Sequence, residues 1–413
     1  MSQALEFYRS PARYLAARGI AATGAGGRLA GAVAGSVSPL RLVDRPAVRR
    51  DEPGWVRLRP QLSGICGSDL SLLGGHSSPY LTPLASLPFV PGHEIVAVTE
   101  GDARGLPAGS RVVVDPVLSC AARATGPCAE CRAGRPNRCG HITTGALKAG
   151  LQTGFCADTG GGWSRSVVAH VSQLHAIPDT LDDRTAVLVE PLACAVHSVR
   201  RAAITPGASV LVVGAGTVGL LTILALREFT AAGPVYVVAK HPHQRAMAEA
   251  LGATETFGVR RIARALRMLT GGTLEHPDLG SEFLLGGVDA AFDCTGGAGG
   301  LDTALRTVRA GGTVVMSGMP SGTVDLAPVW FRELHLIGSY ASAGGPAGAE
   351  GADRPEPSAP DFAEAVRLAG RAGALGGFVD AVYPLARWRE AIGHALSAGR
   401  LGSVKVAFDP NRS

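Results

Sequence analysis

Residues 210–221, VLVVGAGTVGLL, connect two apolar runs through a glycine-rich turn. The β-branched residues before the turn predict a buried strand, and the apolar residues after it predict a helix. Gly214, Gly216 and Gly219 form a G-x-G-x-x-G pattern that suits a tight turn, close approach to a pyrophosphate and close helix–strand packing, in that order. Free N–H groups at the start of the helix would bind the phosphates. The stretch therefore predicts a dinucleotide site, and the alternative is a glycine-rich turn without a ligand.

Strands and helices continue to alternate after this stretch. We expect strands at 209–213, 235–239, 288–293 and 312–317, and helices at 217–228, 242–251, 261–269 and 300–309. Alternation at this spacing predicts a parallel sheet that helices cover on both faces. Residues 270–287 (TGGTLEHPDLGSEFLLGG) are expected to form a loop between two of these units.

The pattern before residue 181 is different. Residues 55–69, 89–100 and 110–120 are strand-like and are separated by turn signals, which predicts an antiparallel, barrel-like domain over roughly residues 40–185. We expect the end of the chain, two helices and a strand, to fold back onto this domain. Residues 19–38 are rich in glycine, alanine and serine and are expected to be a flexible or partly helical lead-in.

Composition excludes several classes of protein. Hydrophobic residues make up 46% of the 413 residues and charged residues 18%, which excludes a disordered chain. The net charge of +5 is spread along the chain, so neither nucleic acid nor a membrane is expected as a partner.

The location of the protein is also constrained by sequence. Glu6 and Arg9 lie where a signal peptide would need an apolar core. Residues 208–226 are uncharged and long enough to span a membrane, but their glycines fit the strand, turn and helix described above. Four of the eight cysteines fall within residues 120–139, which indicates metal binding in a reducing compartment, so we expect a cytoplasmic protein.

The residues after the second expected strand bear on the choice of coenzyme. In NAD-binding proteins an acidic residue usually binds the ribose hydroxyls about 20 residues after the glycines. Here Lys240 stands at that place, followed by His241, His243 and Arg245. Lysine and arginine can pair with a 2′-phosphate that a carboxylate would repel, so NADP is favoured. The alternative is a solvated basic loop with NAD bound regardless.

Four cysteines in one loop segment predict a closed metal site. They are spaced C-x7-C-x2-C-x7-C and are Cys120, Cys128, Cys131 and Cys139. Four thiolates suit a tetrahedral structural zinc without an open position. Free core thiols are an alternative, which the prolines of the segment disfavour. A nucleic-acid-binding zinc ribbon is another, supported only by Arg123, Arg132, Arg135 and Arg138 because no aromatic stacking platform accompanies them.

A second metal site is suggested by residues from separate segments. They are Cys66 in GICGSD, His93 and Glu94 in PGHE, and Glu190 in LVEPLACAVH. A thiolate, an imidazole and a carboxylate make an open zinc site that can accept a substrate oxygen. Each residue alone has an ordinary structural explanation, such as a core cysteine, a turn histidine or a charge at a helix N-terminus.

These motifs, in this order, resemble the zinc-dependent medium-chain dehydrogenases and reductases, a family that includes alcohol, sorbitol and threonine dehydrogenases. The resemblance covers roughly residues 40–413 and rests on GICGSD, PGHE, the four-cysteine loop, VEPLACAVH, GAGTVG and VKVAF. It implies an α/β fold in which a Rossmann doubly wound parallel sheet is inserted in a mainly-β GroES-like catalytic domain. The implied domains are an N-terminal extension expected to be flexible (1–39), the catalytic domain (40–190 and 335–413) and the dinucleotide-binding domain (191–334).

The resemblance also implies roles for single residues at the open metal site. Cys66 and His93 would hold a catalytic zinc together with a carboxylate from Glu94 or Glu190, and which of the two binds directly stays open. Ser68 would hydrogen-bond the substrate alcohol and begin proton transfer.

Further roles follow from the same resemblance. Asp69 would orient a ligand imidazole. Coenzyme contacts are assigned to Gly214, Gly216, Thr217, Val218, Gly219, Lys240, Arg245, Thr295 and Gly318. The assembly would be a homodimer or a homotetramer.

The chain departs from the family pattern in three places. The first gap of the four-cysteine loop has seven residues in place of two, with Thr125 where the first cysteine would fall. That lengthening costs only about 0.9 kcal/mol of loop entropy, against roughly 10 kcal/mol or more from a structural zinc. Ser71 replaces a histidine that ends the proton relay in many members, so the path must use water or another group such as His76. Residues 1–39 have no counterpart in the family.

We therefore expect a zinc-dependent oxidoreductase that transfers hydride between an alcohol or polyol, or the matching ketone or aldehyde, and NAD(P). The absent relay histidine favours one alternative, a reductase of iminium compounds or conjugated C=C bonds on the same fold. A non-catalytic coenzyme-binding protein is a remote alternative, because Cys66, Ser68, His93 and Glu190 occur together. The substrate is a small molecule that the sequence does not specify.

Overall fold

The computed structural model of the chain describes residues 2–23, 31, 33–103, 105–344 and 360–412. The chain divides into two compact units: unit 1 comprises residues 1–190 and 342–413, and unit 2 comprises residues 191–341. Each unit has its own main sheet and its own buried apolar cluster.

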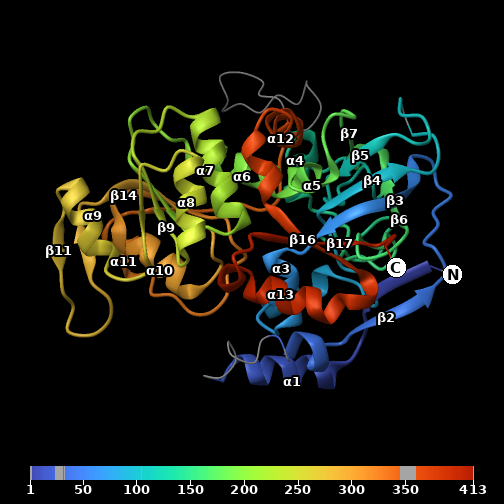
Figure 1. Ribbon diagram of the computed structural model, residues 1–413, viewed down its shortest axis with the longest axis horizontal. Helices are drawn as coiled ribbons and strands as arrows, with labels where there is room; N and C mark the ends of the chain where they lie inside the picture. Colours follow the sequence, from blue (N-terminus) through green and yellow to red (C-terminus); the bar gives the residue numbers. More distant parts are fainter. Residues whose placement is uncertain (1, 24–30, 32, 104, 345–359, 413) are drawn as a thin grey trace. The chain divides into compact units, whose positions relative to one another are not determined.

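Unit 2 contains a six-stranded sheet in which all neighbouring strands are parallel, as predicted. The strand order is β10 (Glu255–Phe257), β9 (Val235–Val238), β8 (Val210–Val213), β13 (Val288–Asp293), β14 (Val308–Met316) and β15 (His335–Gly338). The helices are α6 (Val189–Ala202), which begins in unit 1, α7 (Thr217–Phe229), α8 (Pro242–Ala250), α9 (Ile262–Thr270), α10 (Ala298–Thr307) and α11 (Ala327–Phe331) (Figure 1). Every residue of β8 and β9 is buried, which is typical of parallel strands covered on both faces.

Two expectations for unit 2 differ from the structure. Residues 270–287 are not only loop, because β11 (Thr273–Glu275) and β12 (Phe283–Leu285) pair as an antiparallel ribbon. Leu284 of this ribbon is fully buried in the core of unit 2. The glycines around it in sequence favoured a loop, so the contacts that bury it were not predicted. The catalytic domain was expected to resume at residue 335, but β15 pairs in parallel with β14, so the chain stays in unit 2 as far as Ala341.

Unit 1 contains a seven-stranded sheet that is antiparallel apart from one pair of strands. Its order is β16 (Val379–Pro384), β17 (Lys405–Asp409), β3 (Trp55–Gly64), β4 (Ile95–Thr99), β5 (Arg111–Val114) and β7 (Leu174–Ala176), and β6 (Val167–His170) also pairs with β3. Strand β17 pairs antiparallel with β3, which is the expected return of the chain end to the first domain. Strand β16 was not expected, and it pairs in parallel with β17.

Short helices connect the strands of unit 1. The α-helices are α1 (Pro11–Ala21), α3 (Gly67–Leu73), α4 (Ala129–Arg132), α5 (Asp183–Ala186), α12 (Asp361–Ala369) and α13 (Trp388–Leu401). The other helical turns are η1 (Val33–Val37), η2 (Pro79–Leu84), η3 (Pro136–Arg138), η4 (Val171–Gln173), η5 (Gly373–Gly377) and η6 (Leu385–Arg387). None of the helices formed by the described residues is long and apolar enough to cross a membrane, and the stretch 208–226 contains β8 and most of α7.

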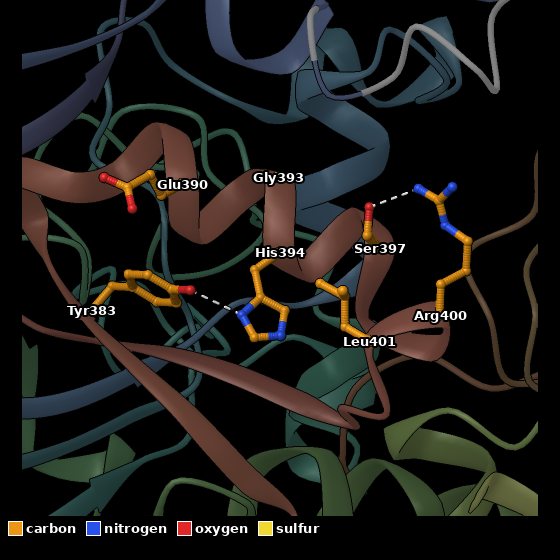
Figure 2. A pocket seen from close by; sticks show the side chains of 7 residues that line it. All are labelled: Tyr383, Glu390, Gly393, His394, Ser397, Arg400 and Leu401. Atoms are coloured by element: carbon orange, nitrogen blue, oxygen red, sulfur yellow. Dashed lines mark hydrogen bonds between the residues drawn. The ribbon is translucent and has the colours of Figure 1, made fainter.

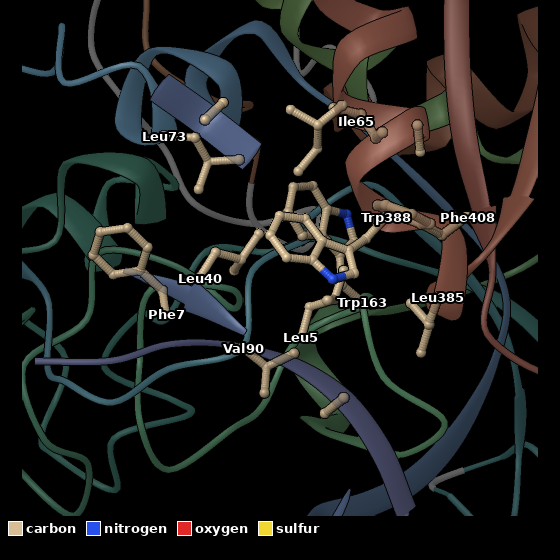
Figure 3. Packing of buried hydrophobic residues seen from close by; sticks show 14 of the residues in the cluster. Leu5, Phe7, Leu40, Ile65, Leu73, Val90, Trp163, Leu385, Trp388 and Phe408 are labelled. Carbon is tan, nitrogen blue, oxygen red and sulfur yellow. The ribbon is translucent and has the colours of Figure 1, made fainter. Parts of the chain in front are cut away.

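The N-terminal residues are part of unit 1, which corrects the expected flexible extension. Strand β1 (Ser2–Phe7) pairs antiparallel with β2 (Leu40–Arg45), and Leu5 and Phe7 are buried. Figure 3 shows Leu5 and Phe7 in one apolar cluster with Trp163. Apolar side chains at 5 and 7 thus anchor the segment. Of the expected lead-in at 19–38, residues 24–30 and 32 lie outside the described residues.

Candidate active site and metal centres

Cys66 lies between the end of β3 and the start of α3. Its backbone N–H donates to Oδ2 of Asp69 at 3.0 Å, so the aspartate caps the helix that follows the cysteine. Ser68 is half-buried in the first turn of the same helix. The motif GICGSD therefore fixes the thiol and the hydroxyl on one short turn.

His93 and Glu94 lie immediately before β4, and both are buried. One ligand atom each from Cys66, His93 and Glu94 lies within 4.8 Å of the other two. The two ends of the connection between β3 and β4 thus converge, because the strands are antiparallel neighbours and the end of β3 pairs with the start of β4.

Asp69 also faces the imidazole of His93. Its Oδ1 lies 3.6 Å from Nδ1 of His93, and within the described part of the chain neither atom has a hydrogen-bond partner. A carboxylate beside Nδ1 favours the tautomer with its proton on that nitrogen, which leaves Nε2 available to a metal. Burial alone would lower the pKa of His93, but Asp69, Cys66 and Glu190 together raise it well above its ordinary value.

Sequence reasoning missed Lys405, the buried cation of this site. Lys405 forms an ion pair with Glu94, and its Nζ donates to the carbonyl of Ile65 at 3.2 Å. Gly64 makes room for this pair, because a Cβ at that position would lie 1.8 Å from Oε2 of Glu94. The available signal was a single lysine inside the otherwise apolar strand motif VKVAF.

Glu190 is near the site but is not in the close group. It is buried at the start of α6, and its charge raises the pKa of both His93 and Lys405. Its carboxylate does not belong to the group of Cys66, His93 and Glu94, whose ligand atoms lie within 4.8 Å of one another.

The charge balance of the site fits a divalent cation. The groups whose charges act on one another are Asp69, Glu94, Glu190, Cys66, His93 and Lys405. Three carboxyl groups outnumber the one lysine and the one imidazole, so with all of them ionised negative charge is in excess among these described groups. Buried charges of this kind need a partner, and a thiolate, an imidazole and a carboxylate are ligands that zinc accepts.

Phe155 is a second residue that the sequence did not single out. Its ring centroid is 6.1 Å from that of His93 and 5.3 Å from that of Phe89. Phe89 in turn stacks on Phe7 of β1 at 5.3 Å. These rings place apolar surface beside the imidazole, which limits the access of water from that side.

The four cysteines of the loop 120–139 come together despite the long first gap. Their sulfur atoms lie within 4.8 Å of one another, and Sγ of Cys120 is 3.5 Å from Sγ of Cys139. Burial would raise the pKa of Cys128, but backbone N–H groups of Gly140 and Cys131 bond its sulfur and lower the pKa to about 6. Burial raises the pKa of Cys131 and Cys139, so it is the closeness of the four sulfur atoms that suits a tetrahedral zinc, and the ion would bind them as thiolates.

The glycine fingerprint has the expected geometry in unit 2. Gly214 has a φ of 96°, which favours glycine. A Cβ at Gly219 would lie 1.8 Å from the carbonyl oxygen of Gly214, so α7 packs directly on the turn. Gly216 precedes α7 and has open space where its Cβ would be, as a cradle for a pyrophosphate requires.

The other residues assigned to the coenzyme lie around this turn in sequence and sheet. Thr217 and Val218 open α7. Lys240 is exposed after β9, and Nη1 of Arg245 donates to the carbonyl of Ala239 beside it at 3.2 Å. The remaining two follow neighbouring parallel strands at their carboxyl ends and are Thr295 after β13 and Gly318 after β14.

A hollow of about 550 Å³ on α13 contains none of the predicted site residues. Its lining residues are Tyr383, Glu390, Gly393, His394, Ser397, Arg400 and Leu401 (Figure 2). His394 is held on both sides, by the hydroxyl of Tyr383 at 2.9 Å and by Oγ of Ser403 at 2.7 Å. The bond from Tyr383 ties α13 to β16, which gives His394 a structural role.

Comparison with known proteins identifies two family matches. The family model for the alcohol dehydrogenase GroES-like domain matches residues 52–179, and the family model for zinc-binding dehydrogenases matches residues 217–350.

Curated relatives and a solved structure agree with these matches. L-idonate 5-dehydrogenase of Vitis vinifera is 31% identical over 295 residues, and the match covers 70% of this chain and 74% of that protein. Sorbitol dehydrogenase of Arabidopsis thaliana is 31% identical over 299 residues, with the same coverage. A crystal structure from Sinorhizobium meliloti 1021, described as a zinc-binding dehydrogenase bound to NADP, is 27% identical with a TM-score of 0.67 and covers 90% of this chain and 95% of that one.

Proposed function

This chain belongs to the zinc-dependent medium-chain dehydrogenases, and we propose that it transfers hydride between a polyol or related secondary alcohol, or the matching ketone, and NADP. That it is a zinc-containing NAD(P)-dependent oxidoreductase follows from the family. The polyol substrate and the preference for NADP are the finer parts of the proposal. Unit 1 is proposed as the catalytic domain and unit 2 as the coenzyme domain.

The observation that carries the proposal is the convergence of Cys66, His93 and Glu94. Zinc held there would supply Lewis-acid polarisation of the substrate oxygen, and the nicotinamide would supply or accept the hydride. Asp69 holds the ring of His93 in the tautomer that offers Nε2.

Ser68 and Phe155 complete the proposed site. The hydroxyl of Ser68, on the turn that carries Cys66, accepts a hydrogen bond from the substrate alcohol and, as it takes the alcohol proton, gives up its own proton to water that leads to solvent. Phe155 excludes water beside His93. Either Glu94 or Glu190 supplies the carboxylate ligand.

Polyols are favoured as the substrate class by the relatives. By their names, these relatives act on sorbitol and on L-idonate. A small polar substrate is also compatible with the several buried carboxyl groups around Cys66 and His93.

The preference for NADP rests on Lys240 and Arg245. Lys240 is exposed where an acidic residue would bind the ribose hydroxyls of NAD, and the bond from Arg245 to the carbonyl of Ala239 keeps a guanidinium at the residue next to this lysine in sequence. Each charged hydrogen bond to a 2′-phosphate contributes about 1.5–3 kcal/mol, enough for a tenfold or larger preference.

A structural zinc is proposed for Cys120, Cys128, Cys131 and Cys139. The closed arrangement of four sulfur atoms leaves no ligand position for a substrate. This ion would therefore stabilise the loop 120–139 and take no part in the reaction.

Self-association as a homodimer or homotetramer is also proposed. Strand β15 is at the edge of the unit 2 sheet, and large aromatic side chains are exposed on either side of it in sequence. They are Trp330, Phe331 and Tyr340. Unpaired edges and exposed aromatic residues are costly in water, and a second copy would cover both.

The second candidate function is reduction of iminium compounds or conjugated C=C bonds. The observation in its favour is Ser71, which cannot accept a proton at neutral pH as a histidine does. An alcohol and polyol panel assayed with NADP and NAD in parallel, beside enals and iminium compounds, tests the choice. Turnover of enals or iminium compounds without turnover of any alcohol, polyol or ketone would contradict the first proposal.

A further inference from the structure

Arg123 is a fully buried arginine, at 0% exposure, within the long gap between Cys120 and Cys128. Among the described residues its guanidinium donates only to backbone carbonyl oxygens. The acceptors are Leu118 at 3.0 Å, Thr144 at 3.0 Å, Leu147 at 3.2 Å, Lys148 at 3.3 Å and Gly150 at 2.6 Å.

These bonds join residues 118–123, where the cysteine loop begins, to residues 144–150, which follow the loop. The backbone completes the connection, because the N–H of Ala146 donates to the carbonyl of Arg123 at 2.9 Å. Gly145 has a φ of 88°, and a Cβ there would lie 2.5 Å from that same carbonyl oxygen. Residues 118–123 and 144–150 are therefore held in close contact around one side chain.

The charge of Arg123 has no carboxylate partner among the described residues at ion-pair distance. Burying an unpaired guanidinium is costly. The nearby groups whose negative charge would stabilise it are Cys156, which is outside the four-cysteine cluster, then Cys139, Asp158 and Cys120. Four thiolates around a zinc ion carry an excess of two negative charges, which would compensate the buried cation.

The position of Arg123 relates to the departure in cysteine spacing. Thr125 occupies the place where the family spacing would put the first cysteine, and its Oγ1 lies 3.2 Å from Nδ1 of His141. Cys120, five residues earlier, supplies the fourth sulfur instead, and its Sγ lies 3.3 Å from the same nitrogen. The intervening chain must be fixed for Cys120 to stay there, and Ala124 in this turn has a φ of 50°.

We propose that Arg123 is a positioning residue of the four-cysteine metal centre, which fastens the lengthened gap so that Cys120 reaches the other sulfur atoms and which balances their charge. The inference rests on the structural zinc proposed above. A bound ion and Arg123 should then stabilise each other: loss of either leaves an uncompensated buried charge.

The experiment measures zinc content and zinc release of the full-length protein. Arg123→Met removes the charge and the bonds, and Arg123→Lys keeps the charge but cannot reach all five carbonyl groups. Arg132→Met is the matched control, because Arg132 is an exposed arginine of the same loop. Release is followed with a chromogenic zinc chelator, and circular dichroism checks that each variant is folded.

The parent and Arg132→Met should contain two zinc ions per chain, and Cys128→Ser should contain one. Arg123→Met should release one of its two ions at least tenfold faster than the parent, with Arg123→Lys between them. Equal release rates for Arg123→Met and the parent would overturn the role of Arg123 alone. Equal zinc content in Cys128→Ser and the parent would overturn the structural zinc and this inference with it. If Arg123→Met fails to fold, the comparison of Arg123→Lys with Arg132→Met decides in the same way.

Discussion

Lys405 of β17 and Glu94, which precedes β4, form an ion pair with only 3% and 1% of their side chains exposed. Strand β3 lies between β17 and β4 in the sheet, and Gly64 at its end leaves the space through which the two side chains meet. Burial alone would lower the pKa of Lys405, but Glu94, Cys66 and Glu190 raise it. The raised pKa keeps Lys405 charged beside the candidate metal site.

Removing one member of this pair should destabilise the protein strongly. Lys405→Met leaves the carboxylate of Glu94 buried without its cation, which typically costs about 3–5 kcal/mol. We expect a lower denaturant midpoint in chemical unfolding. The double variant Lys405→Met/Glu94→Gln removes both charges and should recover much of the loss. A double variant whose loss of unfolding free energy equals or exceeds the summed losses of the two single variants would contradict a direct interaction.

Loss of a proposed zinc ligand should separate catalysis from coenzyme binding. Cys66→Ala or His93→Ala should lower kcat by at least about a thousandfold, because zinc lowers the pKa of a bound oxygen ligand by many units. Coenzyme affinity, measured by fluorescence titration, should stay within about threefold of the parent, because the fingerprint glycines lie in unit 2. Asp69→Asn should lower kcat by about 10–100-fold, as expected for a residue that orients a metal ligand. Full turnover by zinc-free Cys66→Ala would contradict the site.

The two candidate carboxylates can be distinguished by the same zinc measurement. Glu94→Gln and Glu190→Gln keep side-chain size but weaken metal binding. We expect one of them to retain much less zinc at the open site than the other, measured in a Cys128→Ser background that removes the four-cysteine ion. Normal zinc retention by both variants would show that neither carboxylate is a required ligand.

Coenzyme preference should follow the charge at residue 240. Lys240→Asp should reduce kcat/KM for NADP by about 10–100-fold, because it removes a charged hydrogen bond and adds repulsion to the 2′-phosphate. The value for NAD should stay equal or rise. Arg267→Asp, which changes an exposed basic residue on α9, is the control and should alter neither value. No change in the NADP to NAD ratio of Lys240→Asp would refute the assignment.

Asp115, at the end of β5, should make stability depend on pH. Shielding from water, with a smaller contribution from Asp361, raises its pKa from 3.8 to about 7. Between pH 3.8 and about 7 the folded protein keeps the proton of Asp115, whereas the unfolded chain has lost it. The stability that this bound proton contributes is therefore lost as the pH rises towards 7. The unfolding free energy of the parent should fall between pH 5 and pH 8. In Asp115→Asn this fall should be smaller by about 2–3 kcal/mol, because the titrating carboxyl group is absent.

His175 provides a control of opposite sign for that measurement. Burial lowers its pKa from 6.5 to about 4, so the unfolded chain takes up a proton first and stability falls as pH drops below about 6.5. His175→Gln should therefore reduce the loss of stability at the acid end and leave the loss near pH 7 unchanged. Identical pH profiles for Asp115→Asn and the parent would exclude Asp115 as the titrating group.

Self-association should depend on the exposed aromatic residues beside β15. Trp330 is 83% exposed, and Trp330→Glu should shift the protein towards monomer in sedimentation velocity runs. Leu279→Glu is the control, because Leu279 is 91% exposed but lies in the connection between β11 and β12. An unchanged sedimentation coefficient for Trp330→Glu would remove this face from the proposed interface.

Local patterns were sufficient to predict the sheet of unit 2 and the family. The strands VLVV and VYVV, with glycines at 214, 216 and 219, carry their structural information within a few residues, because apolar periodicity and positive φ are local properties. The loop assigned to 270–287 was wrong for a related reason, since Leu284 is buried by contacts with distant parts of the chain that its own neighbours do not reveal.

Chemistry-bearing residues were also recognisable one motif at a time, including Cys66, His93, Glu94 and the four cysteines. Their partners were not. Phe155 and Lys405 become part of the site only because strands distant in sequence pair with one another, and no periodicity marks either residue.

The amino-acid order alone determined which groups could bind a metal and a dinucleotide, because these depend on residue type and short spacing. Only the tertiary structure decided which charges are buried together: Arg123 among carbonyl groups, and Lys405 against Glu94. Charge burial depends on which strands become neighbours, and that is a property of the whole packed unit.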